Sequence, residues 1–402
     1  MRLKEICDYI SRGTTPVYVD ESPYKVMNQA TFSKGWLDES NMRYTSKNAR
    51  EAQIKKGDLL MASTGGGVLG KVFFFDSDDT SFYADSHVSI LRNSKGKNLM
   101  KYLYYVVSIK YDEINATMVK GSTNQTELQR NYLLAYEMDI PSLSKQQRIV
   151  DYLDARLGKI DARIAILEKQ QDAYTRLKKS VVHHAVTRGL NPNVFLKDSG
   201  VEWIGMIPKH WELQRFKSIF TECKSVTETG QEDLLSVSEY YGVARRIDKM
   251  EDGEYESRAD SLVGYKVCKK DDLVINIMLA WKRGLGFSDF DGIVSPAYAV
   301  YRGKDIAPHY FHYLMRTDMY VAEYKRNSKG IIDSRLRMYT DRFNNIMAIV
   351  PPLSEQQAIA AYLDEKCSKI DAATENIGKQ IDALKRLKRA LINEVVTGQR
   401  AV

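Results

Sequence analysis

The chain contains one segment twice, 210 residues apart, and this duplication restricts the folds open to it. The repeated residues are Pro141, Leu143, Ser144, Gln146, Gln147, Ile149, Tyr152, Leu153 and Asp154, which recur as Pro351, Leu353, Ser354, Gln356, Gln357, Ile359, Tyr362, Leu363 and Asp364. The register then holds without a gap through Arg176-Leu177-Lys178 and its copy Arg386-Leu387-Lys388. A duplicated segment without catalytic residues indicates a repeated scaffold, so function is sought in the regions between the copies.

Each copy is expected to form one long helix. Ser144 with Gln147, and Ser354 with Gln357, fit the capping box, in which the two side chains bond to backbone amides at a helix start. Gly189 and Gly398 follow the copies and can take the left-handed conformation that ends a helix. The sequence therefore predicts a central spacer helix at 144–187 and a distal spacer helix at 354–397.

Apolar side chains in both copies recur at alternating steps of four and three residues, the spacing of a coiled-coil seam. The apolar interface positions are Leu153, Leu157, Ile160, Ile164, Leu167, Tyr174 and Val181 in the first copy, and Leu363, Ile370, Ile377, Ile381, Leu384 and Leu391 in the second. The seams have equal length, and a whole domain lies between them, which favours an intramolecular antiparallel coiled coil. The alternative is a long core helix inside a globular fold. At ~1.5 Å per residue, each helix is roughly 65 Å long.

The bulk composition indicates a soluble protein of several domains. The chain has 402 residues, 44% of them hydrophobic and 28% charged, and no apolar run long enough to span a membrane. We therefore expect no membrane contact and a cytoplasmic location. The four cysteines are far apart and are expected to be reduced structural thiols. The net charge of +7 permits nucleic-acid binding without requiring it.

Two stretches of similar length, 1–143 and 211–353, precede the two helices and share a faint skeleton. Lys55-Lys56-Gly57-Asp58-Leu59 in the first stretch resembles Lys269-Lys270-Asp271-Asp272-Leu273 in the second, and each leads into a β-rich run. An aromatic, helix-like stretch and a polar loop follow in both. We interpret them as divergent α/β copies of one ancestor, with a linker at 188–210 and a C-terminal tail at 398–402.

Taken together, several motifs resemble the specificity subunit of type I restriction-modification systems. They are the Pro-x-Leu-Ser-x-Gln-Gln helix starts, Ser11-Arg12-Gly13-Thr14-Thr15-Pro16, the segment from Gly200 to Trp211, and Gly330-Ile331-Ile332-Asp333-Ser334-Arg335-Leu336. The resemblance covers nearly the whole chain. It implies two similar α/β target-recognition domains in a pseudo-two-fold arrangement, joined by two long helices that form an antiparallel coiled coil.

The same resemblance implies the partners and the activity. Each domain would read one half of a bipartite, asymmetric double-stranded DNA target, and the helices would dock two methyltransferase subunits and, through them, restriction (translocase) subunits. The chain itself would be non-catalytic and would need no cofactor. Two alternatives are a fused DNA-modifying enzyme and a coiled-coil organiser that does not contact DNA.

No motif in the sequence predicts catalysis. Residues 64–71 nearly match a phosphate-binding loop, but Val72 stands where the Mg²⁺-binding hydroxyl belongs, and the flanks predict a hairpin. Asn191-Pro192-Asn193-Val194-Phe195 departs from the amino-methyltransferase motif, and the histidines show no metal-ligand spacing. Chemistry is therefore expected in partner subunits.

Loops that combine glycine with polar or basic residues are the candidates for DNA contact, because such side chains bind base edges and phosphates. For each loop, a merely solvated surface is the alternative. The first domain offers Ser63, Thr64, Gly65, Lys71, Ser122, Thr123, Asn124 and Gln125. The second domain offers Arg245, Arg246, Lys282, Arg283, Lys329, Ser334 and Arg335.

Overall fold

The computed structural model describes residues 1–46, 49–65, 67–96, 99–120, 126–246, 248 and 261–402. The chain divides into two compact units. The first unit comprises Met1–Glu168 and Lys379–Val402, and the second comprises Lys169–Gly378. The division runs through both long helices, because each α/β domain packs against the helical segments next to it. In neither unit is a described helix long and apolar enough to cross a membrane.

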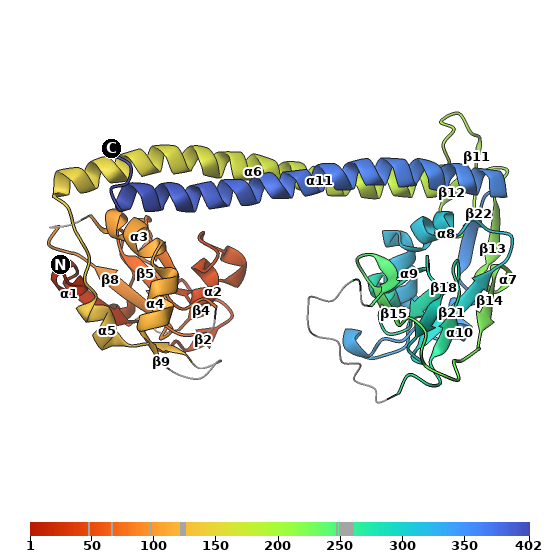
Figure 1. The fold of residues 1–402 in the computed structure, drawn as a ribbon, viewed down its shortest axis with the longest axis horizontal. Coiled ribbons are helices and arrows are strands. Elements are labelled where there is room, and N and C mark those ends of the chain that lie inside the picture. Colours follow the sequence, from red (N-terminus) through yellow and green to blue (C-terminus); the bar gives the residue numbers. More distant parts are fainter. Residues whose placement is uncertain (47–48, 66, 97–98, 121–125, 247, 249–260) are drawn as a thin grey trace. The chain divides into compact units, whose positions relative to one another are not determined.

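The first unit is built on two four-stranded sheets with helices beside them (Figure 1). Its strands are β1 (Tyr9–Arg12), β2 (Tyr18–Val19), β3 (Lys25–Met27), β4 (Arg43–Thr45), β5 (Leu59–Ala62), β6 (Val72–Phe74), β7 (Phe82–Ala84), β8 (Val88–Arg92), β9 (Val119–Lys120) and β10 (Glu127–Leu128). Its short helices are α1 (Leu3–Ile6), α2 (Gln29–Phe32), η1 (Glu39–Asn41), η2 (Arg50–Ala52), α3 (Met100–Ser108), α4 (Tyr111–Thr117) and α5 (Arg130–Ala135). The sheet orders are β1-β8-β5-β6, all antiparallel, and β2-β4-β3-β7.

The second unit repeats the antiparallel sheet of the first, with strand order β14-β21-β18-β19. Its strands are β11 (Leu196–Asp198), β12 (Met206–Pro208), β13 (Glu212–Arg215), β14 (Phe220–Cys223), β15 (Leu235–Ser238), β16 (Gly242–Arg245), β17 (Lys266–Cys268), β18 (Leu273–Asn276), β19 (Leu285–Phe287), β20 (Gly292–Val294), β21 (Tyr298–Gly303) and β22 (Met347–Val350). Its short helices are α7 (Phe216–Ile219), η4 (Ala280–Lys282), α8 (Pro308–Met315), α9 (Asp318–Asn327), η5 (Asp333–Arg335) and α10 (Thr340–Phe343). The prediction of two similar α/β domains is confirmed.

A buried aspartate that is ion-paired with an arginine underlies the faint skeleton shared by the two domains. The carboxylate of Asp58, which is fully buried, lies 2.6 Å from Arg92 on the neighbouring strand β8. Asp272 and Arg302 make the equivalent pair at 2.9 Å in the second unit. Each carboxylate thus ties the turn before the strand to the adjacent strand, since a buried charge requires a partner.

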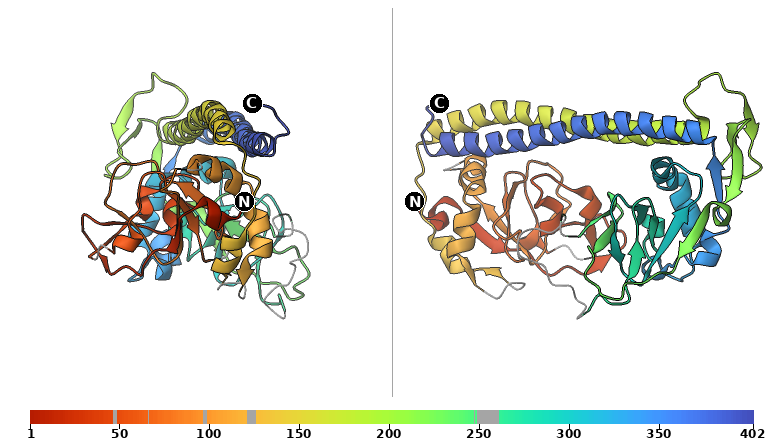
Figure 2. Two further views of the ribbon diagram at one scale, coloured as in Figure 1. Left: turned by 90° about the vertical axis from the view of Figure 1, so that its left-hand side faces the viewer. Right: turned by 45° about the vertical axis from the view of Figure 1, so that its right-hand side comes forward.

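The two long helices are α6 (Leu143–Arg188) and α11 (Leu353–Val396), close to the predicted bounds. In each unit a segment of α6 lies beside a segment of α11 (Figure 2). Lys178 pairs with Asp371 at 2.7 Å in the second unit, and Asp161 pairs with Lys388 at 2.7 Å in the first. Residue numbers rise along one helix as they fall along the other, so the predicted antiparallel packing is confirmed.

The helix starts differ from the predicted capping boxes. Both helices begin one residue early, so Ser144 and Ser354 lie inside the first turn. The first glutamine of each motif reaches outward instead. Gln146 accepts from the Leu99 amide and donates to the Pro141 carbonyl, both at 2.9 Å. Its copy repeats both bonds in the second unit, where Gln356 contacts the Ala307 amide and the Pro351 carbonyl. Each glutamine therefore fastens a domain helix, α3 or α8, to the start of a long helix.

A second repeated contact lies one turn further along. The Tyr105 hydroxyl on α3 donates to Asp154, and Tyr313 on α8 donates to Asp364 at 2.8 Å. Burial, followed by the adjacent carboxylate, raises the pKa of both tyrosines, so they stay protonated as donors. In the first unit Lys101 also pairs with Asp154, at 2.7 Å. His309 takes that place in the second unit, 3.2 Å from Asp364.

Candidate nucleic-acid interface

In the first unit, the residues after β5 divide between the core and the surface. Ser63 is fully buried, and its hydroxyl lies 2.6 Å from that of Ser89. Thr64 is half-buried, and its Oγ1 lies 2.8 Å from Nδ1 of the exposed His87. Gly65 has a φ of +89°, and its amide donates to Thr126. Thr64 and His87 can therefore meet a ligand, whereas the Ser63 side chain holds the fold together.

Lys71 stands at the end of the β5–β6 hairpin, which the sequence predicts correctly in place of a phosphate-binding loop. The lysine is half-buried and makes no ion pair with any residue that the structure describes. Its ammonium is thus available for a phosphate. The other first-domain candidates, Ser122, Thr123, Asn124 and Gln125, lie outside the described residues.

Arg12 is a basic residue of the first unit that is not among the predicted DNA contacts. Its guanidinium lies 2.5 Å from Glu127 and donates to the carbonyls of Ser63 and Leu128. Together with Arg130 it lines a cavity of about 510 Å³. The signal for it was the Ser11–Pro16 motif, which supported the family resemblance but was not read as a site.

The second unit presents a cationic and aromatic cluster beside η4. The ammonium groups of Lys282 and Lys325 lie 5.0 and 5.2 Å from the centroid of the Trp281 ring. The indole donates to the Met278 carbonyl, which holds the ring within cation–π distance of the two lysines. Lys282 was predicted, but Trp281 and Lys325 were not, because η4 and α9 come together only in the fold.

Arg283 is held by groups of its own domain. Its φ is +62°, its Nε donates to the Arg316 carbonyl, and its guanidinium pairs with Asp318. Arg316 in turn donates to the carbonyls of Arg283 and Leu285. Burial, with Arg283 nearby, lowers the pKa of Arg316 to about 10. These arginines therefore bind the turns of the domain to one another, and Arg283 is a weak candidate for DNA contact.

The other basic candidates of the second unit lie on β16, just after it, and in the loop after α9. Arg245 pairs with Asp233 at 3.2 Å and covers the Phe290 ring, while Arg246 is half-buried. Lys329 and Arg335 are exposed, and Ser334 lies between them on η5. Lys329 and Arg335 can reach a ligand without breaking an ion pair among the described residues.

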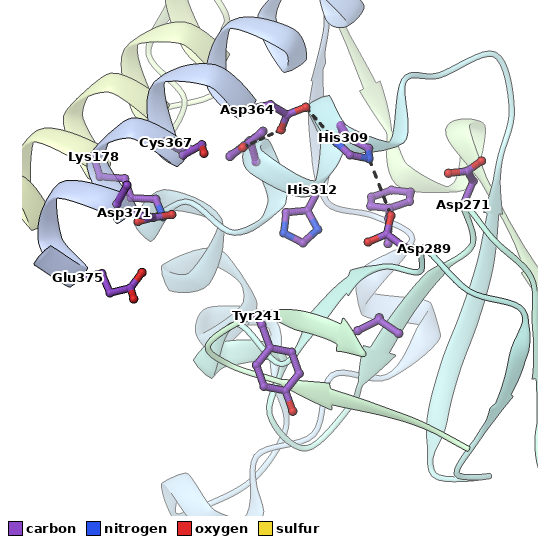
Figure 3. Close-up of a pocket in the computed structure, with 15 residues that line it drawn as sticks. Lys178, Tyr241, Asp271, Asp289, His309, His312, Asp364, Cys367, Asp371 and Glu375 are labelled. Atoms are coloured by element: carbon purple, nitrogen blue, oxygen red, sulfur yellow. Dashed lines mark hydrogen bonds and ion pairs between the residues drawn. The ribbon is translucent and has the colours of Figure 1, made fainter. Parts of the chain in front are cut away.

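A cavity of about 650 Å³ in the second unit lies between α8, α11 and the neighbouring strand ends. His309 stands between Asp364 and Asp289, at 3.2 and 4.0 Å (Figure 3). Five carboxylates line the cavity, against one lysine: Asp271, Asp289, Asp364, Asp371 and Glu375, with Lys178. This balance disfavours a phosphate. The cavity belongs to the attachment of the domain to its helix.

The predicted interface positions of the long helices are buried or half-buried. Leu153, Leu157, Ile164, Leu167, Leu363, Ile370, Ile377, Ile381 and Leu391 are at most 9% exposed, and Ile160, Tyr174, Val181 and Leu384 are half-buried. Leu177 and its copy Leu387 lie off this seam and are 47% and 54% exposed. In the second unit Leu177 lines a groove of about 460 Å³ with Tyr174 and Ile377.

None of the His, Cys, Asp and Glu side chains that the structure describes form a group of three that could hold a metal ion. Burial raises the pKa of Cys7 and Cys268 to about 12, so both thiols stay protonated. Where described, the basic and aromatic side chains instead suit the binding of a polyanion.

Comparison with known proteins points to one family. The family model described as type I restriction modification DNA specificity domain matches residues 1–173. The specificity subunit of the type I restriction enzyme MjaVIII from Methanocaldococcus jannaschii is 21% identical over 420 residues, covering 99% of this chain and 92% of that protein. The chain is thus similar in sequence to type I specificity subunits.

Two further comparisons extend this relationship. The EcoKI specificity subunit of Escherichia coli is 20% identical over 213 residues, which cover 48% of this chain and 44% of that subunit. A chain from a solved structure concerned with complex assembly and conformational transition of the type I R-M system has the same fold. It superimposes with a TM-score of 0.67 at 15% identity, covering 98% of this chain and 96% of that one. The fold shared with that chain therefore extends over both units.

Proposed function

We propose that this chain is the DNA sequence-recognition subunit of a type I restriction-modification complex in the cytoplasm. It binds a bipartite, asymmetric double-stranded DNA target, with one domain on each half-site. The observation that carries the proposal is the similarity to a type I specificity subunit along 99% of the chain. The two α/β domains, with one sheet topology and different loops, support it, because the same scaffold can present two different reading surfaces.

The two half-sites should differ, because the candidate loops differ in chemistry. The first domain offers Thr64, His87 and Lys71, whereas the second offers Trp281 with two adjacent lysines and the loop after α9. Exchanging residues 1–143 for the corresponding domain of a relative should change one half of the methylated sequence and spare the other. Methylome sequencing of a host that expresses the system reads both halves. A simultaneous change in both halves would disprove independent reading.

The helices are proposed to dock two methyltransferase subunits and, through them, the restriction subunits. Leu177 and Leu387 support this assignment, because they are exposed, apolar and related by the internal repeat. Replacing either leucine with aspartate should weaken the binding of one methyltransferase subunit, measured by the mass of the purified complex. Arg176→Asp is the control for charge, because it alters the neighbouring residue without removing the apolar side chain.

Catalysis is assigned to those partners, and the chain is proposed to need no cofactor. The purified chain alone should neither methylate nor cleave a target duplex, and should gain methylation activity when its methyltransferase partner is added. Turnover by a partner-free preparation, or binding of S-adenosylmethionine, would favour a fused enzyme. Failure of the assembled complex to bind any duplex would favour a coiled-coil organiser.

A further inference from the structure

The loop after α9 in the second unit has a closed, defined shape. Lys329 and Arg337 exchange both backbone hydrogen bonds, each at 2.9 Å, and so close the loop at its base. Gly330 has a φ of +154°, and a Cβ there would lie 2.6 Å from the Arg335 carbonyl oxygen. The backbone at Arg335 therefore passes directly over Gly330, and only glycine fits at this position.

Further contacts fix the loop to the domain. Asp333 pairs with Lys325 on α9 at 3.0 Å, and the amide of the buried Met338 donates to the Ile277 carbonyl at 2.8 Å. Ile277 directly follows β18, and Lys325 lies over the Trp281 ring. The loop is thus attached to the same surface that carries the cationic and aromatic cluster.

The tip of this loop is apolar. Ile331 is 99% exposed and Ile332 is 53% exposed, so the first contributes almost no buried area to the fold. The exposed cations Lys329 and Arg335 flank the pair on either side. An apolar tip within a cationic rim matches a ligand whose surface is anionic and whose interior is apolar.

Double-stranded DNA has this distribution, with phosphates outside and base faces and thymine methyl groups inside. Aliphatic side chains contact thymine methyl groups in the major groove or enter between base steps.

We propose that Ile331 makes an apolar contact with a base in the half-site read by the second domain. The inference rests on the proposed function and deepens it, because it names a residue and the part of the DNA that it touches. Lys329 and Arg335 hold the flanking phosphates, and the closed loop keeps the isoleucine extended between them.

The test uses the full chain assembled with its methyltransferase subunits, and a duplex that carries the target defined by methylation mapping. Ile331→Ser should weaken binding about tenfold, as expected when roughly half of an isoleucine side chain is no longer buried. Ile331→Val should retain most of the affinity. Phe195→Ser is the matched control, since Phe195 is also highly exposed, at 83%, but lies on the segment between α6 and β11. The melting temperature should be unchanged in all three variants.

Two arms identify the apolar group of the DNA. Replacing each thymine of the half-site with uracil should weaken binding of the wild type at one position and leave Ile331→Ser unaffected, if the contact is a thymine methyl. With 2-aminopurine in the half-site, wild-type binding should raise fluorescence and Ile331→Ser should not, if the side chain enters the base stack.

Several outcomes would overturn the proposal while leaving the function intact. They are equal duplex binding by Ile331→Ser and wild type, loss of affinity without either base signature, and loss of methyltransferase assembly in the variant. Binding of the wild type to anionic phospholipid vesicles that depends on Ile331 would also overturn it. A wild-type complex that binds no duplex would instead refute the proposed function.

Discussion

At the scale of single residues, many of the charged and polar side chains that suggest a binding site are used to hold the fold together. Ser63, chosen for its place after a strand in a glycine-containing turn, is buried and bonded to Ser89. Arg283 is ion-paired with Asp318 of its own domain. Residue type alone predicts neither outcome, because each depends on a partner that is distant in sequence.

His312 gives a prediction at this scale. Burial, followed by the charges of Arg316 and His309, lowers its pKa to about 3. His312 therefore stays neutral in the folded chain at pH values at which it is protonated in the unfolded chain, that is, below the ordinary histidine pKa of about 6.5. Stability of the second unit is present in full above that pH and falls as the pH drops toward 3.

Because of His312, lowering the pH from 7 to 5 should reduce the free energy of unfolding of the second unit by roughly 1–2 kcal/mol. Urea unfolding of His312→Gln at both pH values should show a smaller loss than the wild type. His184→Gln, a substitution at an exposed position on α6, should leave the difference unchanged. An identical pH dependence in His312→Gln would assign the acid sensitivity to other groups.

At the scale of the elements, the internal repeat reproduces contacts and not only sequence. The glutamine and tyrosine hydrogen bonds that join α3 to α6 in the first unit recur between α8 and α11 in the second. Gln356 and the backbone groups that it binds are buried. Removing one partner of a buried hydrogen bond leaves the other polar group buried without a partner, which is destabilising.

Gln356→Ala should therefore destabilise the second unit by about 2–4 kcal/mol, because it strands the Ala307 amide and the Pro351 carbonyl. Hydrogen exchange followed by mass spectrometry should become faster in α8 and stay unchanged in α3. Gln146→Ala should do the reverse, and Gln357→Ala, at the exposed neighbouring position, should do neither. Equal effects on α3 and α8 would contradict two separate attachments.

The elements were more predictable from the sequence than the candidate site. Two long helices, their antiparallel packing and the β5–β6 hairpin depend on local periodicity, repetition and turn residues. The bond between Gln146 and the Leu99 amide was missed, because the two residues lie far apart in sequence and meet only in the fold. Trp281 and Lys325 were missed for the same reason, since they are 44 residues apart.

At the scale of the whole molecule, the long helices are proposed to set the spacing between half-sites. Inserting four residues after Glu168 and four after Gly378 adds one turn, or ~6 Å, to each helix. Because a four-residue insertion keeps the seam nearly in phase, the coil should tolerate it. The spacer in the methylated sequence should lengthen by about one or two base pairs, at ~3.4 Å each. The half-sites should not change.

Methylation mapping of the insertion variant reads the spacer and both half-sites together. The same insertion in α6 alone is the control, because it leaves α11 one turn short and should abolish activity. An unchanged spacer with full activity would show that a segment outside the helices determines the geometry.

The discontinuous make-up of the first unit has a consequence for biosynthesis. Residues 169–378 form a continuous unit that can fold as soon as they leave the ribosome. The first unit, although started earlier, must wait for Leu391, Ile392 and Val395, which belong to the same apolar cluster as Leu153 and Leu157. During translation its nascent apolar face is open to chaperones and to neighbouring polysomes, so the domain begun first is the last to mature.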